Sequence, residues 1–377
     1  MARISFRGGL TIGLFILIAY LILLTGLGYI GNVGNNRLEF PDPEKPKVVE
    51  FTFSFMNQEF TVTDTLYNSY YKYYQLYAER FPNIRTYVEY YKFIKEMDPT
   101  DDTITRITNS LQELGAAAGF NADQTLELAM RFVQSIPYDV TKADQVVVSA
   151  DDEDGPPRTD LLPRHPYITL YDRLGVCSDK TVLAAAIAEE MGYATAIFSF
   201  DREVLGTGVG HVGLGVKCPL PYSHHNSGYC YVETTAPVRI GMSNIYLAAD
   251  TQAATPYTHP DTDQINLDFS QAELYKLEEG KIYYGIIETR NLESRLRDLG
   301  ITIDRQKEEI DRLRIRVNQL NTTLQRMADE GLVQQYYSEY ARVYDEYELS
   351  VRRFNGLIEQ YNENVDEYNQ VVRSMDY

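Results

Sequence analysis

The chain has 377 residues, enough for one substantial core with additions, and it carries a formal net charge of −19 with a pI near 4.7. So acidic a surface argues against nucleic acid as a partner, because phosphate binding depends on clustered Lys and Arg. It also argues against an anionic membrane surface as the main docking site. The composition includes 31 tyrosines and no tryptophan.

An apolar run from Gly9 to about Ile30 follows two basic residues, Arg3 and Arg7. Its length of about twenty residues suffices to span a bilayer as a helix. Basic residues before the run and acidic sequence after it place the N-terminus in the cytoplasm and the rest outside. A cleaved signal peptide is the alternative, with cleavage near Gly28, Gly31 or Gly34. We therefore expect a single-pass membrane protein whose bulk is extracytoplasmic.

The chain divides into four expected segments. They are a cytoplasmic stub and transmembrane anchor at 1–34, a linker at 35–48, an extracytoplasmic domain at 49–285 with its core at 130–240, and a helical hairpin at 286–377.

Alternating apolar residues predict a β-hairpin over 48–63 that turns through Asn57 and Gln58. A helical stripe of tyrosines follows, which we expect to pack in the core with hydroxyls at its rim: Tyr67, Tyr70, Tyr71, Tyr74 and Tyr77. Two further helices are expected at about 102–116 and 122–135. Residues 140–162 are expected to form a loop, with a solvated acidic run at 151–154. Calcium binding is the alternative there, although the spacing misses the EF-hand pattern.

Cys177 lies where a turn becomes a helix, and Gly192 is placed to cap that helix at its C-terminus. The helix is alanine-rich, and its apolar stripe predicts one buried face: Leu183, Ala186, Ile187 and Met191. Unpaired N–H groups and the positive end of the helix dipole favour a negative charge at such a thiol. This is the environment of a nucleophile, and Asp179 fits a helix-start charge better than a catalytic group.

Three strand-like runs follow this helix, at 194–200, 211–216 and 229–234. A helix followed by consecutive strands predicts an α+β fold with an antiparallel sheet. From about residue 286 the pattern becomes helical alone, with apolar residues alternating by three and four on both sides of a break at 329–331. We expect an antiparallel coiled-coil hairpin, and self-association in trans is the competing use of the same apolar seams.

Cys218 and Cys230 flank a turn-like segment in a compartment that permits disulfides. Pairing them closes a hairpin and leaves Cys177 as the odd thiol. A zinc site that adds His224 and His225 is the alternative, but short metal-type spacings are absent.

His211 opens one strand and Glu233 lies on the next, and alternation places their side chains on matching faces, opposite the two cysteines of the hairpin. Pairing His211 directly with Glu233 would place Cys218 opposite Asn226. One or both of the two side-chain pairs must therefore be diagonal, or a bulge must intervene.

The order of a cysteine at a helix start, a histidine on a strand and an acid on the next strand resembles the transglutaminase-like superfamily, which is related to papain. The motifs that carry the resemblance cover about residues 130–240. They are Ile136–Asp139, Pro166–Leu170, Gly175–Lys180, Met191–Tyr193, Gly210–Val212 and Tyr231–Thr235.

The resemblance implies that Cys177 is the nucleophile, His211 the base and acid, and Glu233 the group that orients the imidazole. The backbone N–H of Cys177, with Tyr138 or Gln134, is the implied oxyanion site. The chain departs from the family in three ways. It has glutamate where aspartate is commoner, Val176 where a polar residue often stands, and no tryptophan near the reacting centre.

We therefore expect a membrane-anchored, extracytoplasmic cysteine protease or acyl transferase that forms an acyl-enzyme with peptide or isopeptide amide bonds. Its substrate would be a protein or peptide, and we expect no cofactor and no metal. The alternative is an inactive module of the same fold whose coiled coil recruits a partner or a second copy.

Overall fold

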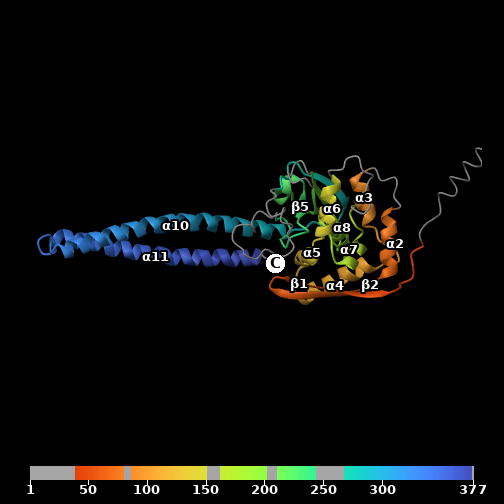
Figure 1. Cartoon of the computed structure of the whole chain (residues 1–377), viewed down its shortest axis with the longest axis horizontal. Helices are drawn as coiled ribbons and strands as arrows, with labels where there is room; N and C mark the ends of the chain where they lie inside the picture. The colour runs from red at the N-terminus through yellow and green to blue at the C-terminus, as the bar shows by residue number, and fades with distance from the viewer. Residues whose placement is uncertain (1–38, 80–85, 151–161, 202–209, 243–266, 376–377) are drawn as a thin grey trace, which may run out of the picture. The chain divides into compact units, whose positions relative to one another are not determined.

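A computed structural model describes residues 39–79, 86–150, 162–201, 210–242 and 267–375 (Figure 1). The predicted membrane anchor and the acidic run at 151–154 lie outside these ranges. Within them, no helix combines the length and the apolar character needed to cross a bilayer. Everything from Pro43 onward belongs to one unit by its contacts.

Strands β1 (Pro46–Phe55) and β2 (Gln58–Tyr67) form the first, two-stranded antiparallel sheet. The hairpin is confirmed, but it turns through Met56 and Asn57, one residue earlier than predicted. Both of these residues have positive φ, as a two-residue hairpin turn requires. Every second residue of β1 is buried from Val49 onward, and the Phe51 and Phe53 rings meet Phe132 edge-on, with centroids 5.2 and 5.9 Å away.

Four helices follow: α2 (Asn68–Glu79), α3 (Tyr87–Ile94), α4 (Thr103–Ala117) and α5 (Ala122–Ser135). The helices predicted at 102–116 and 122–135 are confirmed as α4 and α5 within one residue at the ends. Asn121 and Gln124 form the reciprocal capping box that starts α5. Of the predicted tyrosine stripe only Tyr74 is buried, and the other four are half-buried. The Tyr74 hydroxyl is itself buried and donates to Asp101 Oδ2 at 2.9 Å.

The predicted loop over 140–162 is wrong for its first half, because α6 spans Val140–Ala150. The β-branched residues of this segment have low helix propensity, so the sequence pattern did not predict a helix. Asp139 caps the start of α6 by accepting a hydrogen bond from the N–H of Lys142 at 3.0 Å. Helix α7 (Pro166–Asp172) has the buried His165 as its N-cap.

Helix α8 (Cys177–Glu190) begins at the predicted cysteine and ends as expected. Gly192 has φ of 85°, and the N–H groups of Gly192 and Tyr193 donate to Glu189 and Ala188 in a Schellman motif. The prediction of one buried face was too narrow. Every residue from Asp179 to Ala188 is buried, because α4, α5, α7 and the second sheet surround this helix.

The second sheet has four antiparallel strands in the order β5-β4-β3-β6. They are β3 (Thr195–Phe200), β4 (His211–Lys217), β5 (Tyr229–Val232) and β6 (Glu273–Glu278). The three predicted strands are confirmed as β3, β4 and β5. Strand β6 was not predicted, because it is a short, mostly exposed and charged edge. Two short 3-10 helices, Leu220–Tyr222 and His224–Asn226, connect β4 to β5.

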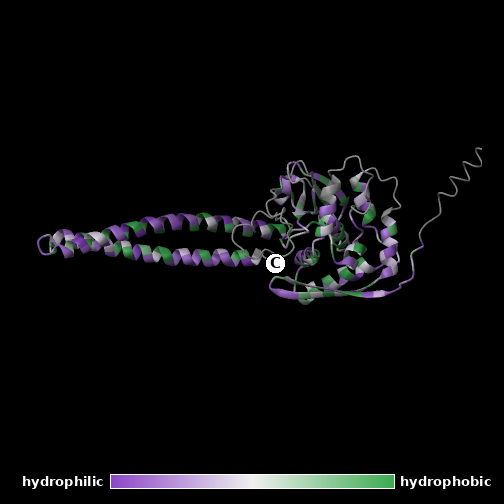
Figure 2. Cartoon of the chain, viewed as in Figure 1, coloured by the Kyte–Doolittle hydropathy of each residue, from purple (hydrophilic) through white to green (hydrophobic). Residues whose placement is uncertain are grey.

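Helices α10 (Ile286–Asp329) and α11 (Tyr337–Met375) run side by side as an antiparallel hairpin (Figure 1). Figure 2 shows hydrophobic and hydrophilic residues alternating along both helices. Leu320, Leu324 and Val343 form a buried cluster between them. Arginine–glutamate pairs tie the helices together along their length: Arg295–Glu367, Arg316–Glu346 and Arg353–Glu309. The predicted hairpin is therefore present, while association in trans stays untested.

His165 makes a prediction about acid stability. Its ring is fully buried and stacked 3.7 Å from the Tyr74 ring, and burial lowers its pKa to about 3. The unfolded chain, with a histidine pKa of about 6.5, binds a proton that the folded chain does not. The resulting stability is complete above pH 6.5 and is lost as pH falls toward 3. His224, whose pKa is also lowered to about 3 chiefly by burial, acts in the same direction.

Between pH 7 and 5.5 we expect urea unfolding to show a loss of about 1 kcal/mol for each of these two histidines. His165→Gln should remove one share of this loss, whereas His225→Gln, at an exposed site, should leave the pH dependence unchanged. Equal slopes for wild type and His165→Gln would contradict the assignment.

Candidate active site

Cys177 is the first residue of α8 and is half-buried. Its thiol is free, because the other two cysteines are paired in the disulfide. The backbone N–H groups of a first helical turn have no intrahelical acceptor, so they face whatever approaches the thiol. The turn before the helix holds Gly175, whose N–H donates to Pro137 O at 3.2 Å and whose carbonyl accepts from Asp139 N at 3.3 Å. The segment that carries Tyr138 is thereby held beside the cysteine.

A buried charge cluster fixes the start of α8. Asp179, fully buried, accepts from the N–H of Val176 at 3.1 Å, from Lys142 Nζ at 2.7 Å and from the N–H of Arg164 at 2.7 Å. Arg164 also pairs with Asp139 at 2.7 Å. Asp179 is therefore a structural group at the helix start, as its position in the sequence indicated.

His211 begins β4 and is 7% exposed. Its Nε2 lies 3.0 Å from Glu233 Oε2, and Cys177 lies near enough to help raise the pKa of His211. Because Nε2 faces the carboxylate, the ring nitrogen left for Cys177 is Nδ1. The structure thus brings Cys177, His211 and Glu233 together, in the order that a nucleophile, a base and an orienting acid need.

The strand register explains how the two side-chain pairs fit on one hairpin. Leu214 lies opposite Val232, and Val216 lies opposite Cys230. Continued by one residue, this register places Glu233 opposite Gly213, two positions along β4 from His211. Both the His–Glu pair and the cysteine pair are diagonal. Diagonal neighbours on an antiparallel pair remain within reach of long side chains, and neither pair needs a bulge.

Glu233 is 2% exposed, and donors surround its carboxylate. Oε1 accepts from the N–H and the hydroxyl of Thr235, at 2.8 and 2.5 Å, and Oε2 accepts from the Tyr231 hydroxyl at 2.7 Å. Burial opposes its charge, but His211 and these donors outweigh burial and lower the pKa of Glu233 to about 2. The carboxylate is ionised at neutral pH.

The electrostatics of His211 follow from the same contacts. Burial alone would lower the pKa of His211, but the Glu233 carboxylate and the hydrogen bond to Cys177 raise it well above its usual value. The site therefore favours a protonated imidazole next to the thiol, the arrangement that a thiolate nucleophile requires.

Lys180, one turn into α8, is a buried amine that sequence reasoning missed. Its Nζ donates to the backbone carbonyls of Ile136 at 2.7 Å and Gln134 at 3.1 Å. Burial lowers its pKa to about 7, while Glu233 and Cys177 oppose that shift. The only signal in the sequence was a lysine directly before the alanine-rich apolar part of the helix.

The two predicted oxyanion donors differ in placement. The Gln134 amide donates to the carbonyls of Glu233 and Val238, both at 2.8 Å, so its N–H groups are engaged away from the thiol. Tyr138 bridges Gly175 through its backbone. Burial is the main cause that raises the pKa of Tyr138, and Cys177 and Glu233 add to it. The Tyr138 hydroxyl therefore keeps its proton close to the site.

Cys218 and Cys230 form the predicted disulfide, with their Cα atoms 5.7 Å apart. Because both thiols are part of this disulfide, they cannot be the ligands of the alternative zinc site. His224, within the closed loop, instead accepts a hydrogen bond from the N–H of Tyr231 at 3.0 Å. Among the described residues, no group of histidine, cysteine and acidic side chains is arranged to hold a metal ion.

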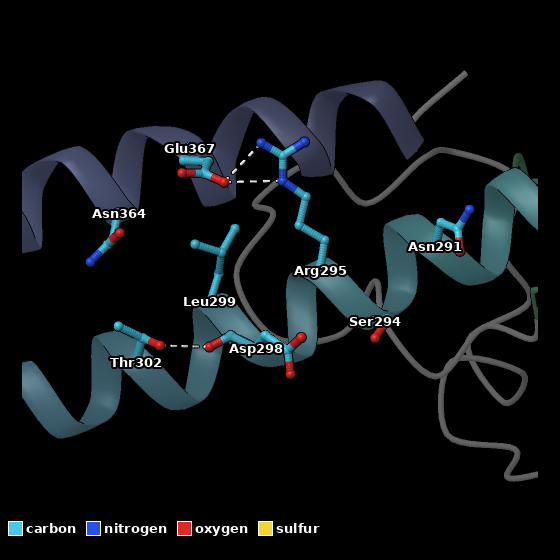
Figure 3. A pocket seen from close by; sticks show the side chains of 8 residues that line it. All are labelled: Asn291, Ser294, Arg295, Asp298, Leu299, Thr302, Asn364 and Glu367. Carbon is cyan, nitrogen blue, oxygen red and sulfur yellow. Dashed lines mark hydrogen bonds and ion pairs between the residues drawn. The ribbon is translucent and has the colours of Figure 1, made fainter.

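A groove of about 460 Å³ lies between α10 and α11, away from these residues in the sequence (Figure 3). Figure 3 shows Arg295 of α10 reaching across to Glu367 of α11, and the two are joined by hydrogen bonds of 2.8 and 3.0 Å. Thr302 donates to the Asp298 carbonyl of its own helix. These polar groups satisfy one another, which is the arrangement of a hairpin contact rather than of a catalytic site.

The helix-borne thiol, the histidine that begins a strand and the carboxylate beyond it define a fold of the cysteine acyl-transfer type. Residues 104–219 match a family model described as a transglutaminase-like domain, so the chain contains a transglutaminase-like domain. The match includes Cys177 and His211 and ends before Glu233. No curated protein and no solved structure matches significantly.

Proposed function

We propose that this protein is a cysteine acyl-transfer enzyme that attacks amide bonds of peptides or proteins and forms an acyl-enzyme on Cys177. The observation that supports it is the grouping of Cys177 with His211, whose ring is hydrogen-bonded to the buried Glu233 carboxylate. A module kept only for binding has no need of a charged, fully buried histidine–glutamate pair at a free thiol.

In the first half-reaction, Cys177 Sγ attacks the amide carbonyl and a carbon–sulfur bond forms. The proton held by His211 passes to the amide nitrogen, the carbon–nitrogen bond breaks, and the amine leaves. Glu233, ionised and held by Thr235 and Tyr231, keeps the imidazole oriented and stabilises its positive charge.

In the second half-reaction, His211 takes a proton from water, whose oxygen attacks the thioester. The carbon–sulfur bond breaks, which yields the acid and the free thiol. An amine in place of water gives a new amide by the same steps, and hydrolysis is the simpler outcome because no acceptor site is defined.

The oxyanion of the intermediate would be bound by the backbone N–H of Cys177 and by the Tyr138 hydroxyl. The first supports a negative charge as part of the helix start, and the second is held beside the thiol by the bridge to Gly175. We do not extend this role to Gln134, because its amide donates to backbone carbonyls.

We also propose that the enzyme acts outside the cytoplasm from an N-terminal membrane anchor. The disulfide supports this location, because such bonds persist in oxidising compartments. The helical hairpin of α10 and α11 is a candidate surface for a protein partner or a second copy.

Alkylation by an iodoacetamide reporter at pH 6 tests the proposal, because an ordinary thiol is almost wholly protonated there. We expect the folded protein to react at least about tenfold faster than the same protein unfolded in urea. Cys177→Ala should abolish labelling, and His211→Ala should reduce the rate to that of the unfolded thiol. His225→Ala, on the exposed turn of the disulfide loop, is the matched control.

A wild-type rate equal to that of the unfolded thiol, unchanged in His211→Ala, would contradict the enzyme proposal. That result would favour the alternative, an inactive transglutaminase-like module that binds a partner.

A further inference from the structure

The Tyr231 hydroxyl lies between the two residues that the proposed mechanism places behind the nucleophile. It is 2.7 Å from Glu233 Oε2 and 3.0 Å from His211 Nε2, and the side chain is fully buried. Three polar groups therefore meet at one point within the protein, and the proposed chemistry uses the phenol only as a donor to Glu233.

The proton positions at this point follow from what each group can donate. An ionised carboxylate only accepts, so the Tyr231 hydrogen is directed to Glu233 Oε2. The phenol oxygen then offers only lone pairs to His211. Nε2 must carry a hydrogen to face both oxygens, and Nδ1 is left to exchange a proton with Cys177.

The fold leaves a space above Gly213 that the Tyr231 ring fills. Gly213 lies opposite Glu233 in the strand register, and a Cβ at Gly213 would be 2.2 Å from Tyr231 Cε2. Aromatic rings surround Tyr231 at centroid distances of 5.3 to 6.0 Å: Phe198, Phe200 and Phe269. Its own backbone N–H is held by His224.

We infer that Tyr231, seated on Gly213, is a positioning residue that fixes the plane and the tautomer of the His211 imidazole. The inference rests on the proposed function. It predicts that removing one oxygen atom weakens the pairing of His211 with Cys177 while the charged groups stay in place.

The other titratable groups that face this pair come from three further segments. Cys177 on α8 and Glu233 after β5 act on both His211 and Tyr231, while Lys180 on α8 and Tyr138 beside the α8 turn act on Cys177 and Glu233. Tyr231→Phe leaves all four unchanged, so a change in the pH dependence of Cys177 alkylation can be assigned to the lost hydroxyl.

The test compares Tyr231→Phe with Tyr229→Phe in the full chain, using iodoacetamide at pH 6 and at pH 9.5. Tyr229 is equally buried on the same strand but lies opposite Lys217. We expect Tyr231→Phe to react about tenfold more slowly than wild type at pH 6, because a hydrogen bond to a charged group is lost. At pH 9.5, where thiols are ionised regardless, the rates should agree within about twofold. Tyr229→Phe should match wild type at both values.

A double variant separates positioning from a general loss of structure. In a His211→Ala background, Tyr231→Phe should produce no further decrease, because the phenol acts through the imidazole. Gly213→Ala, which displaces the ring, should reproduce the loss at pH 6 if the variant melts cooperatively.

Equal rates for Tyr231→Phe and wild type at pH 6 would overturn this inference and leave the proposed function standing. A further decrease caused by Tyr231→Phe in the His211→Ala background would do the same. A wild-type thiol no faster than the unfolded chain would overturn both.

Discussion

Glu233→Gln is expected to lower amide turnover by about 10³- to 10⁴-fold, the effect seen when a neutral amide replaces the acid of a catalytic triad. The substitution changes hardly any volume, so the loss comes from hydrogen-bond polarity. Thr235 donates twice to Oε1, which will keep the amide oxygen of the new residue in that position. The amide NH₂ must then face His211 Nε2, which accepts only when its proton has moved to Nδ1. An Nδ1–H imidazole cannot take a proton from Cys177.

The measurement is again the iodoacetamide rate at pH 6, followed by peptide turnover once a substrate is identified. Glu233→Gln should alkylate no faster than the unfolded thiol. Glu233→Asp, which keeps the charge on a shorter arm, should retain part of the rate. Glu279→Gln, at a surface pair with Lys217, is the control and should leave the rate unchanged. A Glu233→Gln protein as reactive as wild type would remove Glu233 from the proposed site.

Asp179→Ala is expected to cost about 3–5 kcal/mol in the free energy of unfolding, since it breaks a buried ion pair and leaves the partner charged. Lys142 is 3% exposed and donates to Asp179 at 2.7 Å. Burial lowers the pKa of Lys142, and Asp179 is the main group that opposes this shift. The N–H groups of Val176 and Arg164 also lose their acceptor, so the start of α8 should loosen at Cys177.

Urea unfolding at pH 7 measures this cost. Lys217→Ala, which removes a pair whose glutamate is 73% exposed, should leave the stability close to that of wild type. Lys142→Met combined with Asp179→Ala should recover part of the loss, because no unpaired charge is left buried. A small cost for Asp179→Ala, comparable with the surface control, would show that the cluster is not what holds the helix start.

Much of the fold followed from local pattern. Two-residue alternation predicted the first hairpin, and the helices α4 and α5 were predicted within one residue at their ends. The glycine at 192 marked the end of α8 because a left-handed residue is needed there. The elements missed were those whose local signal is weak: the short helices α3 and α7, the helix α6 with its β-branched residues, and the charged edge strand β6.

The candidate site could be predicted in part. The positions of Cys177, His211 and Glu233 in successive elements indicated which side chains meet, and strand alternation placed the last two on matching faces. The register stayed open, because parity does not distinguish a direct from a diagonal pair. Tyr231 shared the face of Glu233, yet its role depends on the space above Gly213, which no pattern in the chain reveals.

The sequence by itself determined the order of the elements, the odd thiol at a helix start and the acid–histidine strand pair, because these depend on spacing and on the chemistry of single residues. Only the tertiary structure decided the diagonal register, the burial of α8 on every side and the buried charges of Asp179, Lys142 and Lys180. Burial and charge pairing are made by segments distant along the chain, so the proton arrangement behind Cys177 exists only when they are packed together.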